Sequence, residues 1–291
     1  MSKTMRIVKL QLRLQKPAFR KGLDIAKLRK TQAASVSMPP VEGVTFREET
    51  LGGCPVDVAV PAECRDDAAI FYIHGGGFIS GDPRNYRSFT SFLAKESGWP
   101  VYGVIYRLAP EHPFPAGPED CCAAWKALSE ANPHKKLYLV GESAGGTLVL
   151  VTALMARDRG LRRPDAVVSY APAACLGESL DRSGAGRRDP IVSPGAIPAL
   201  QALYCPTDPA NPYASPGYAS FHDFPPLRIV WDRDETLAPD GRLLAGKVRE
   251  AGGYIESREW EGTFHTFEMI PTVLPEAREE VLASIEFLKK F

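Results

Sequence analysis

The sequence predicts an α/β fold with a mostly parallel, doubly wound sheet, and three observations support this fold class. From about residue 68 onward, short apolar segments alternate with segments of helical periodicity. Most of the apolar segments lack polar–apolar alternation, as expected for parallel strands covered by helices on both faces. The chain has 291 residues, enough for one large α/β domain whose core needs no disulfides. Alternation of strand and helix in this order predicts helices on both sides of the sheet.

The strands are predicted from segments rich in β-branched and aromatic residues. Residues Thr45–Val60 precede the alternation and are predicted to add an antiparallel hairpin at the edge of the sheet. The predicted parallel strands are Ala69–Ile73, Val101–Tyr106, Leu137–Val140, Ala166–Tyr170, Leu227–Trp231 and Tyr254–Trp260.

The helices between these strands carry recognisable start and stop signals. Pro118 with Glu119 and Asp120 is typical of a first helical turn, since carboxylates are favourable at the positive end of the helix dipole. A second helix is predicted to follow Ser143 and to end in basic residues before Gly160. The last helix is predicted to begin at Pro275.

Two regions do not fit the alternation and are candidates for a cap over one end of the sheet. The first is residues 1–45, and the second is an insertion at about residues 172–224 that is rich in Pro and Gly. Within the insertion a helix is predicted over Pro194–Tyr204, with Ser193 as its N-cap. Residues 46–291, including the insertion, are predicted to form the catalytic domain.

Charge is balanced over the whole chain but not along it. Lys plus Arg and Asp plus Glu each total 35, which gives no indication of a nucleic-acid partner. Residues 1–30 carry ten basic residues against Asp24 alone, about +9. This segment has three interpretations: it is a loosely docked charged segment, it contacts a membrane or polyanion, or it is an active-site lid. The segment lacks the continuous apolar run that a secretory signal peptide contains. No stretch of the chain approaches the roughly 20 apolar residues that a membrane helix needs.

The six cysteines show no metal-binding or redox spacing. Without an export signal, they are interpreted as reduced thiols of a cytoplasmic protein, and a Cys54–Cys64 disulfide is not favoured.

Ser143 is the candidate nucleophile, in Gly141-Glu142-Ser143-Ala144-Gly145. This motif lies between a predicted buried strand and a predicted buried helix, where a sharp turn lifts the central hydroxyl above the sheet at a helix N-terminus. The flanking residues Gly141 and Gly145 allow the strand and the helix to pass each other closely.

The segment His74-Gly75-Gly76-Gly77-Phe78 is the candidate oxyanion-binding loop. Three glycines directly after a strand allow backbone N–H groups to point into a cavity. His74 is expected to brace this loop. A phosphate-binding loop is not favoured, because the Lys-Ser/Thr of such loops is absent.

The base is predicted to be His265, which follows the last strand at the carboxyl end of the sheet. The order nucleophile, acid, histidine in this fold also selects it among the five histidines. Three aspartates compete as the orienting acid after Leu227–Trp231. Asp234 is preferred because it has enough loop to reach the imidazole; Asp232 is too close to the strand, and Asp240 is interpreted as a helix N-cap. Glu235 is a minor alternative.

With these residues in place, the chain from about residue 68 onward resembles the hormone-sensitive-lipase-like esterases, a branch of the α/β hydrolases, which implies the α/β-hydrolase fold with a small helical cap. The matching motifs are His74–Phe78, Tyr106–Ala116, Gly141–Gly145, Asn211–Pro216, Asp234–Leu237 and Gly262–Phe267. The resemblance implies a carboxylesterase acting on short- to medium-chain acyl esters through an acyl-enzyme, without metal or cofactor. It also implies that Gly76, Gly77 and Ala144 form the oxyanion hole, that Asp234 is the acid, and that the N-terminal helices belong to the cap.

Several alternatives stay open at this stage. Phe78, Tyr106 and the cap residues around Ile197–Tyr204, Ile197 and Tyr204 above all, are candidates for lining the substrate pocket. An amidase or lactonase would use the same residues, and relatives of this fold that act as ligand receptors have lost the catalytic histidine. The expected partner is a small ester, with no integral membrane segment, and a homodimer is an open alternative.

Overall fold

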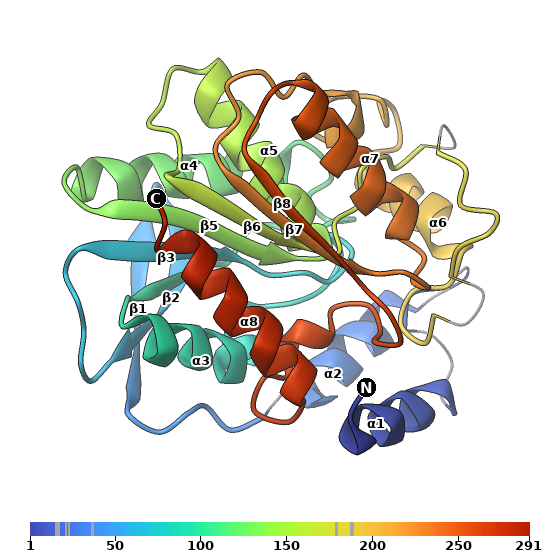
Figure 1. The fold of residues 1–291 in the computed structure, drawn as a ribbon. Coiled ribbons are helices and arrows are strands. Elements are labelled where there is room, and N and C mark those ends of the chain that lie inside the picture. The colour runs from blue at the N-terminus through green and yellow to red at the C-terminus, as the bar shows by residue number, and fades with distance from the viewer. Residues whose placement is uncertain (15–17, 21, 23, 36–37, 178–179, 187–188) are drawn as a thin grey trace.

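An eight-stranded twisted sheet runs through the centre of the molecule (Figure 1). The computed structural model describes residues 1–291 except 15–17, 21, 23, 36–37, 178–179 and 187–188. The strand order is β1-β2-β4-β3-β5-β6-β7-β8. The strands are β1 (Val44–Leu51), β2 (Cys54–Pro61), β3 (Ala68–Ile73), β4 (Val101–Val104), β5 (Lys136–Glu142), β6 (Ala166–Tyr170), β7 (Leu227–Asp232) and β8 (Ile255–Trp260).

The pairing confirms the predicted fold class. Strands β3 to β8 are parallel to their neighbours, whereas β1 pairs with β2, and β2 with β4, in antiparallel register. The predicted hairpin at the edge is therefore present as β1 and β2. All six residues of β3 are buried, and they alternate between two cores. This burial on both faces is why the strand segments show no polar alternation.

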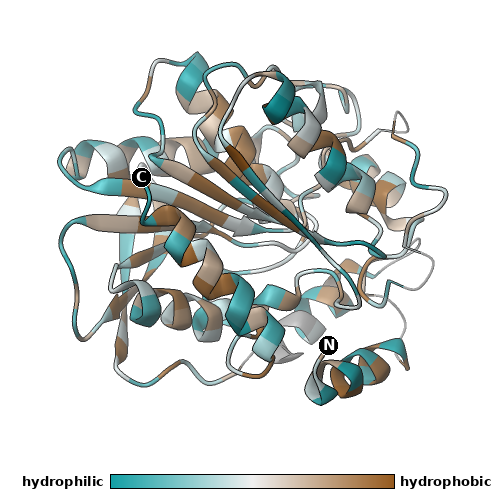
Figure 2. Ribbon diagram, in the orientation of Figure 1, coloured by the Kyte–Doolittle hydropathy of each residue, from teal (hydrophilic) through white to brown (hydrophobic). Residues whose placement is uncertain are grey.

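Helices cover both faces of the sheet (Figure 1). One face carries α4 (Ala116–Ala131), α5 (Ala144–Asp158) and α7 (Ala238–Glu250), and the other carries α3 (Arg87–Ser97) and α8 (Pro275–Leu288). Short 3₁₀ helices lie at Pro83–Tyr86, Pro216–Tyr218 and Phe267–Met269. Apolar residues, brown in Figure 2, concentrate in the central strands and on the sides of the helices that face the sheet.

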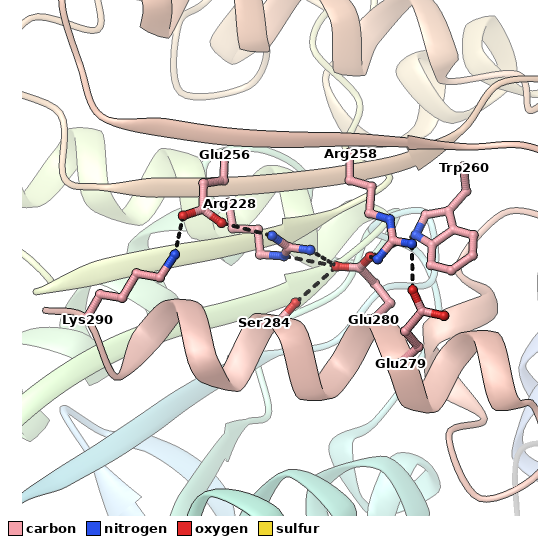
Figure 3. Close-up of polar contacts among 8 residues, drawn as sticks. All are labelled: Arg228, Glu256, Arg258, Trp260, Glu279, Glu280, Ser284 and Lys290. Carbon is pink, nitrogen blue, oxygen red and sulfur yellow. Dashed lines mark hydrogen bonds and ion pairs between the residues drawn. The ribbon is translucent and has the colours of Figure 1, made fainter.

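A buried ion-pair network attaches α8 to the last two strands (Figure 3). The carboxylate of Glu280, fully buried on α8, accepts hydrogen bonds from Arg228 of β7 at 2.6 and 2.9 Å and from the indole of Trp260 at 2.8 Å. On the surface of the same helix, Glu279 pairs with Arg258 at 2.7 Å. Because β8 leads directly into the loop of His265, this network supports the end of the sheet where the site is built.

The described N-terminal residues form two docked helices, α1 (Lys3–Arg13) and α2 (Ile25–Ser35), so the interpretation as a loosely docked segment is wrong for them. Phe19, between these helices, forms a parallel bridge with Val192. Its N–H donates to Ile191 O at 3.0 Å, and its carbonyl accepts from Ser193 N at 2.8 Å. On α2, Arg29 donates to Ile79 O at 2.7 Å and pairs with Glu111.

Two predicted helix caps are wrong. The cap-region helix α6 (Ala196–Tyr204) begins after Gly195, and the expected cap Ser193 instead provides its carbonyl to Ala196 N. Asp240 lies inside the first turn of α7 rather than before it. Its buried carboxylate accepts from Ala174 N at 2.7 Å and pairs with Arg182, so it holds the loop after β6. No helix in the described part of the chain has the length and apolar character needed to cross a membrane.

Candidate active site

Ser143 occupies the sharp turn between β5 and α5, as predicted. Its φ of 54° and ψ of −121° lie in a region that non-glycine residues rarely adopt. The turn is tight because the two elements pass closely: a Cβ on Gly145 would lie 2.0 Å from Ile73 O. A hydrogen bond of 2.8 Å from Ser143 N to Tyr170 O holds the turn against β6.

The Ser143 hydroxyl is within hydrogen-bond distance of an imidazole. His265 Nε2 lies 2.9 Å from Ser143 Oγ, and the other ring nitrogen, Nδ1, lies 2.8 Å from Glu235 Oε2. Both the imidazole and the carboxylate are buried. This places nucleophile, base and acid in the chain order and geometry of a serine hydrolase.

The structure gives the acid position to Glu235 and not to the predicted Asp234, which is exposed. The physical reason is the turn after β7. Asp232, at the strand end, turns its carboxylate sideways and accepts from the N–H groups of Asp234 and Thr263 at 2.9 and 2.8 Å. The same turn leaves the side chains of Arg233 and Asp234 exposed and brings Glu235 against His265. The sequence already allowed Glu235 as the acid, because α/β hydrolases use Glu as well as Asp in this position.

The neighbours of the imidazole are held by further hydrogen bonds. The Thr263 hydroxyl donates to Asp232 at 2.7 Å, which fixes the start of the His265 loop. Thr236, next to Glu235, donates through its N–H to Asp189 at 2.9 Å and through its hydroxyl to Val192 O at 2.5 Å. The acid loop is thereby tied to the cap region.

Burial and mutual contact shift the pKa values of Glu235 and His265. Burial raises the pKa of Glu235 above the ordinary value of a glutamate, although the facing imidazole opposes the shift. Burial alone would lower the pKa of His265, but the adjacent carboxylate outweighs it and raises this pKa above 6.5. The carboxylate therefore favours the imidazolium that forms when the imidazole takes a proton.

The glycine loop after β3 presents unused N–H donors beside Ser143. Gly76 has a φ of 116°, and a Cβ there would lie 2.0 Å from Ser80 O, so only glycine fits. In the described part of the chain, the N–H groups of Gly76, Gly77 and Ala144 donate to no other protein group. Gly77 and Ala144 line the same pocket as Ser143, and unpaired N–H donors beside the nucleophile are what an oxyanion hole requires.

Buried polar groups hold the other side of this loop. Glu142 Oε1 accepts from Gly75 N at 2.6 Å, and its Oε2 accepts from the Tyr72 hydroxyl at 2.9 Å. Burial raises the pKa of Glu142 to about 8, although the Gly75 N–H opposes this. His74 braces the loop as predicted: its Nδ1 lies 2.7 Å from Gly75 O, and burial lowers its pKa to about 4.

A narrow apolar pocket opens at Ser143. Two of the four predicted lining residues, Phe78 and Ile197, line it. The other two do not: Tyr106 is buried and donates to His74 O at 2.9 Å, and Tyr204 lies behind Phe78, with the rings stacked 4.0 Å apart. Leu200, within the predicted cap segment Ile197–Tyr204, also lines the pocket, whereas Phe19, Ala173, Leu176, Val192 and Leu237 were not predicted. In the described residues, no group of three or more His, Cys, Asp or Glu side chains is arranged to hold a metal ion.

Comparison with known proteins agrees with this geometry. The model of a family described as having the α/β-hydrolase fold matches residues 70–269. The chain belongs to this α/β-hydrolase family. Over 258 residues it is 32% identical to an acetyl-hydrolase of Streptomyces hygroscopicus, covering 88% of this chain and 84% of that protein. It is 28% identical to the carboxylesterase NlhH of Mycobacterium tuberculosis, covering 92% and 89% of the two chains.

Solved structures place the chain more narrowly among bacterial relatives. A crystal structure of an esterase from the bacterial hormone-sensitive lipase family superposes with a TM-score of 0.92 at 30% identity, over 100% of this chain and 98% of that one. A hormone-sensitive lipase from a metagenome library gives the same TM-score at 31% identity, over 99% and 97%. The predicted resemblance is confirmed.

Proposed function

We propose that this chain is a serine carboxylesterase that hydrolyses short- to medium-chain acyl esters through an acyl-enzyme on Ser143. Its membership among esterases of the hormone-sensitive-lipase family makes it a carboxylic ester hydrolase. The observation that carries the mechanism is the continuous hydrogen-bonded series from Ser143 Oγ through His265 to Glu235. The presence of the histidine in this series argues against a non-catalytic receptor.

The proposed reaction has two acyl-transfer steps. His265 Nε2 takes the Ser143 proton as Oγ attacks the ester carbonyl, and Glu235 stabilises the resulting imidazolium. The N–H groups of Gly76, Gly77 and Ala144 bind the oxyanion of the tetrahedral intermediate. The imidazolium then protonates the departing alcohol, and water repeats the sequence on the acyl-enzyme.

The apolar pocket is proposed to bind the acyl chain, with acetyl to butyryl esters as the preferred substrates. Its walls close tightly over the oxyanion loop: a Cβ on Gly77 would lie 2.9 Å from both Leu200 Cδ2 and Phe19 Cε1. Leu200 comes from α6 and Phe19 from the N-terminal segment. We propose accordingly that residues 1–45 and 172–224 form a cap whose packing limits chain length.

The nucleophile is tested with Ser143→Ala. This variant should lose on the order of 10⁶ in kcat toward p-nitrophenyl butyrate. It should also fail to react with a fluorophosphonate label while keeping the circular dichroism spectrum of the parent. Retained turnover or labelling would refute the proposal.

Chain length is tested with a series of p-nitrophenyl esters from acetate to laurate. We expect the highest kcat/KM at acetate to butyrate and a steep fall beyond octanoate. Leu200→Ala should shift the preference toward longer chains, whereas Gln201→Ala, on the same helix but outside the pocket, should not. An unchanged profile in Leu200→Ala would place the acyl group elsewhere.

A further inference from the structure

Helix α1 has apolar side chains on two opposite faces. Its inner face contributes Met5, which is fully buried against Phe264, Phe267, Leu274 and Ala277. Its outer face carries Ile7 and Leu10, and Leu14, the residue that caps its C-terminus, continues the same stripe. These three side chains are 58%, 62% and 81% exposed. In Figure 2, α1 shows hydrophobic and hydrophilic residues side by side at the periphery of the molecule.

The orientation of α1 is fixed, so the exposure of this stripe does not result from a freely rotating helix. Ser2 caps the helix by accepting from Met5 N at 3.0 Å, and both its N–H and its hydroxyl donate to Glu276 of α8. On the inner face, Lys9 is buried beside the carboxylates of Asp232 and Asp234. Turning the outer stripe inward would remove this lysine from its anionic neighbours and expose Met5.

The charges around the stripe define its partner. The sequence of α1 contains no acidic residue, and the basic residues Lys3, Arg6 and Arg13 are exposed around the apolar stripe. Exposed leucine and isoleucine among arginine and lysine are typical of helices that lie in the surface of an anionic bilayer. A second copy of this chain fits the stripe poorly, because symmetric pairing of α1 would bring like charges together.

We infer that α1 docks the enzyme on the surface of a membrane containing anionic lipids, with Ile7, Leu10 and Leu14 inserted between headgroups and the arginines on lipid phosphates. Such docking would place the bilayer next to the active site. The inner face of α1 packs on Phe264 and Phe267, which flank His265. The inference goes beyond the proposed esterase activity, since the site itself is complete without a membrane.

The test is flotation with vesicles of phosphatidylcholine and phosphatidylglycerol at 3:1, compared with pure phosphatidylcholine. The parent protein should bind the anionic vesicles at least tenfold more tightly, since each basic residue near such a surface adds about fivefold. The binding should weaken in 1 M NaCl, where the Debye length shortens to about 3 Å. Leu10→Ser/Leu14→Ser should lower the partition coefficient at least tenfold, and Lys3→Glu/Arg6→Glu should abolish the preference for anionic lipid.

Two control variants separate this surface from general effects. Gln11→Ser changes an exposed polar residue beside the stripe and leaves its apolar side chains and its charges intact. Lys126→Glu/Lys289→Glu makes the same net charge change as the double charge reversal, but on α4 and near the end of α8. Both should bind vesicles like the parent. All variants should hydrolyse p-nitrophenyl butyrate in water at the parent rate, which separates failure of docking from failure of the proposed activity.

Two outcomes would overturn the inference. One is equal partition of the parent protein to anionic and neutral vesicles, or none to either. The other is a dimer in sedimentation velocity that dissociates in Leu10→Ser/Leu14→Ser, which would assign the stripe to a second copy of the chain.

Discussion

The assignment of the acid to Glu235 gives a prediction that separates two adjacent residues. Glu235→Gln keeps the size of the side chain but removes the charge that lies 2.8 Å from His265 Nδ1. With charge centres about 4 Å apart and an effective dielectric constant of about 20, the attraction to an imidazolium is about 4 kcal/mol. At about 1.4 kcal/mol per tenfold change in rate, kcat/KM should fall about 10³-fold.

Asp234→Asn is the matched control. Asp234 is exposed, and its side chain contacts neither His265 nor Ser143 among the contacts of the described residues. The variant should keep kcat/KM for p-nitrophenyl butyrate within about twofold of the parent, since surface substitutions of this kind have small effects.

The pH profile provides a second readout for the same pair. In the parent, the carboxylate raises the pKa of His265 above 6.5 against the effect of burial. The imidazole must be neutral to act as a base, so kcat/KM should fall as pH drops through that raised pKa. In Glu235→Gln the main contribution opposing burial is lost, and only the weaker effects of Asp189 and Glu142 still raise the pKa of His265. The acid limb should therefore move to lower pH. A large loss in Asp234→Asn with little change in Glu235→Gln would refute the assignment.

Three further predictions concern the support of the site. Glu280→Ala leaves Arg228 buried without its main partner and should lower the free energy of unfolding in urea by about 3 kcal/mol. Glu279→Ala removes an exposed ion pair and should lower the same free energy by less than about 1 kcal/mol. Similar losses in the two variants would contradict the role of burial. Burial raises the pKa of Glu268 well above 4.5, so the unfolded chain releases this proton at lower pH than the folded one, and stability should fall as pH rises between the two pKa values. Glu268→Gln should remove this fall, so that the slope of unfolding free energy against pH becomes less negative by about 1.4 kcal/mol per unit in that range. An unchanged slope would show that the group is not protonated when folded. Gly76→Ala places a methyl group against Ser80 O and should reduce kcat on the order of 10²- to 10³-fold, because it displaces the oxyanion donors. A kcat equal to that of the parent would contradict the role of this loop.

The sequence by itself predicted the sheet, the nucleophile and the base. Strands buried on both faces leave continuous apolar runs, which can be recognised without knowing their partners. The serine turn is specified by local residues, since Gly145 allows a close passage that no side chain permits. His265 was selected by chain order and by its place after the last strand, both of which are properties of the sequence.

The tertiary structure alone decided which acid, which pocket walls and which face of α1 are used. Asp234 and Glu235 are adjacent in sequence, and the turn that brings Glu235 inward is held by hydrogen bonds that Asp232 accepts from Asp234 N and from Thr263 N in the His265 loop. Phe19 reaches the pocket through a bridge to Val192, a contact between distant segments that leaves no periodic pattern. Local patterns arise from neighbours along the chain, whereas these choices depend on burial between segments that meet only when the chain has folded.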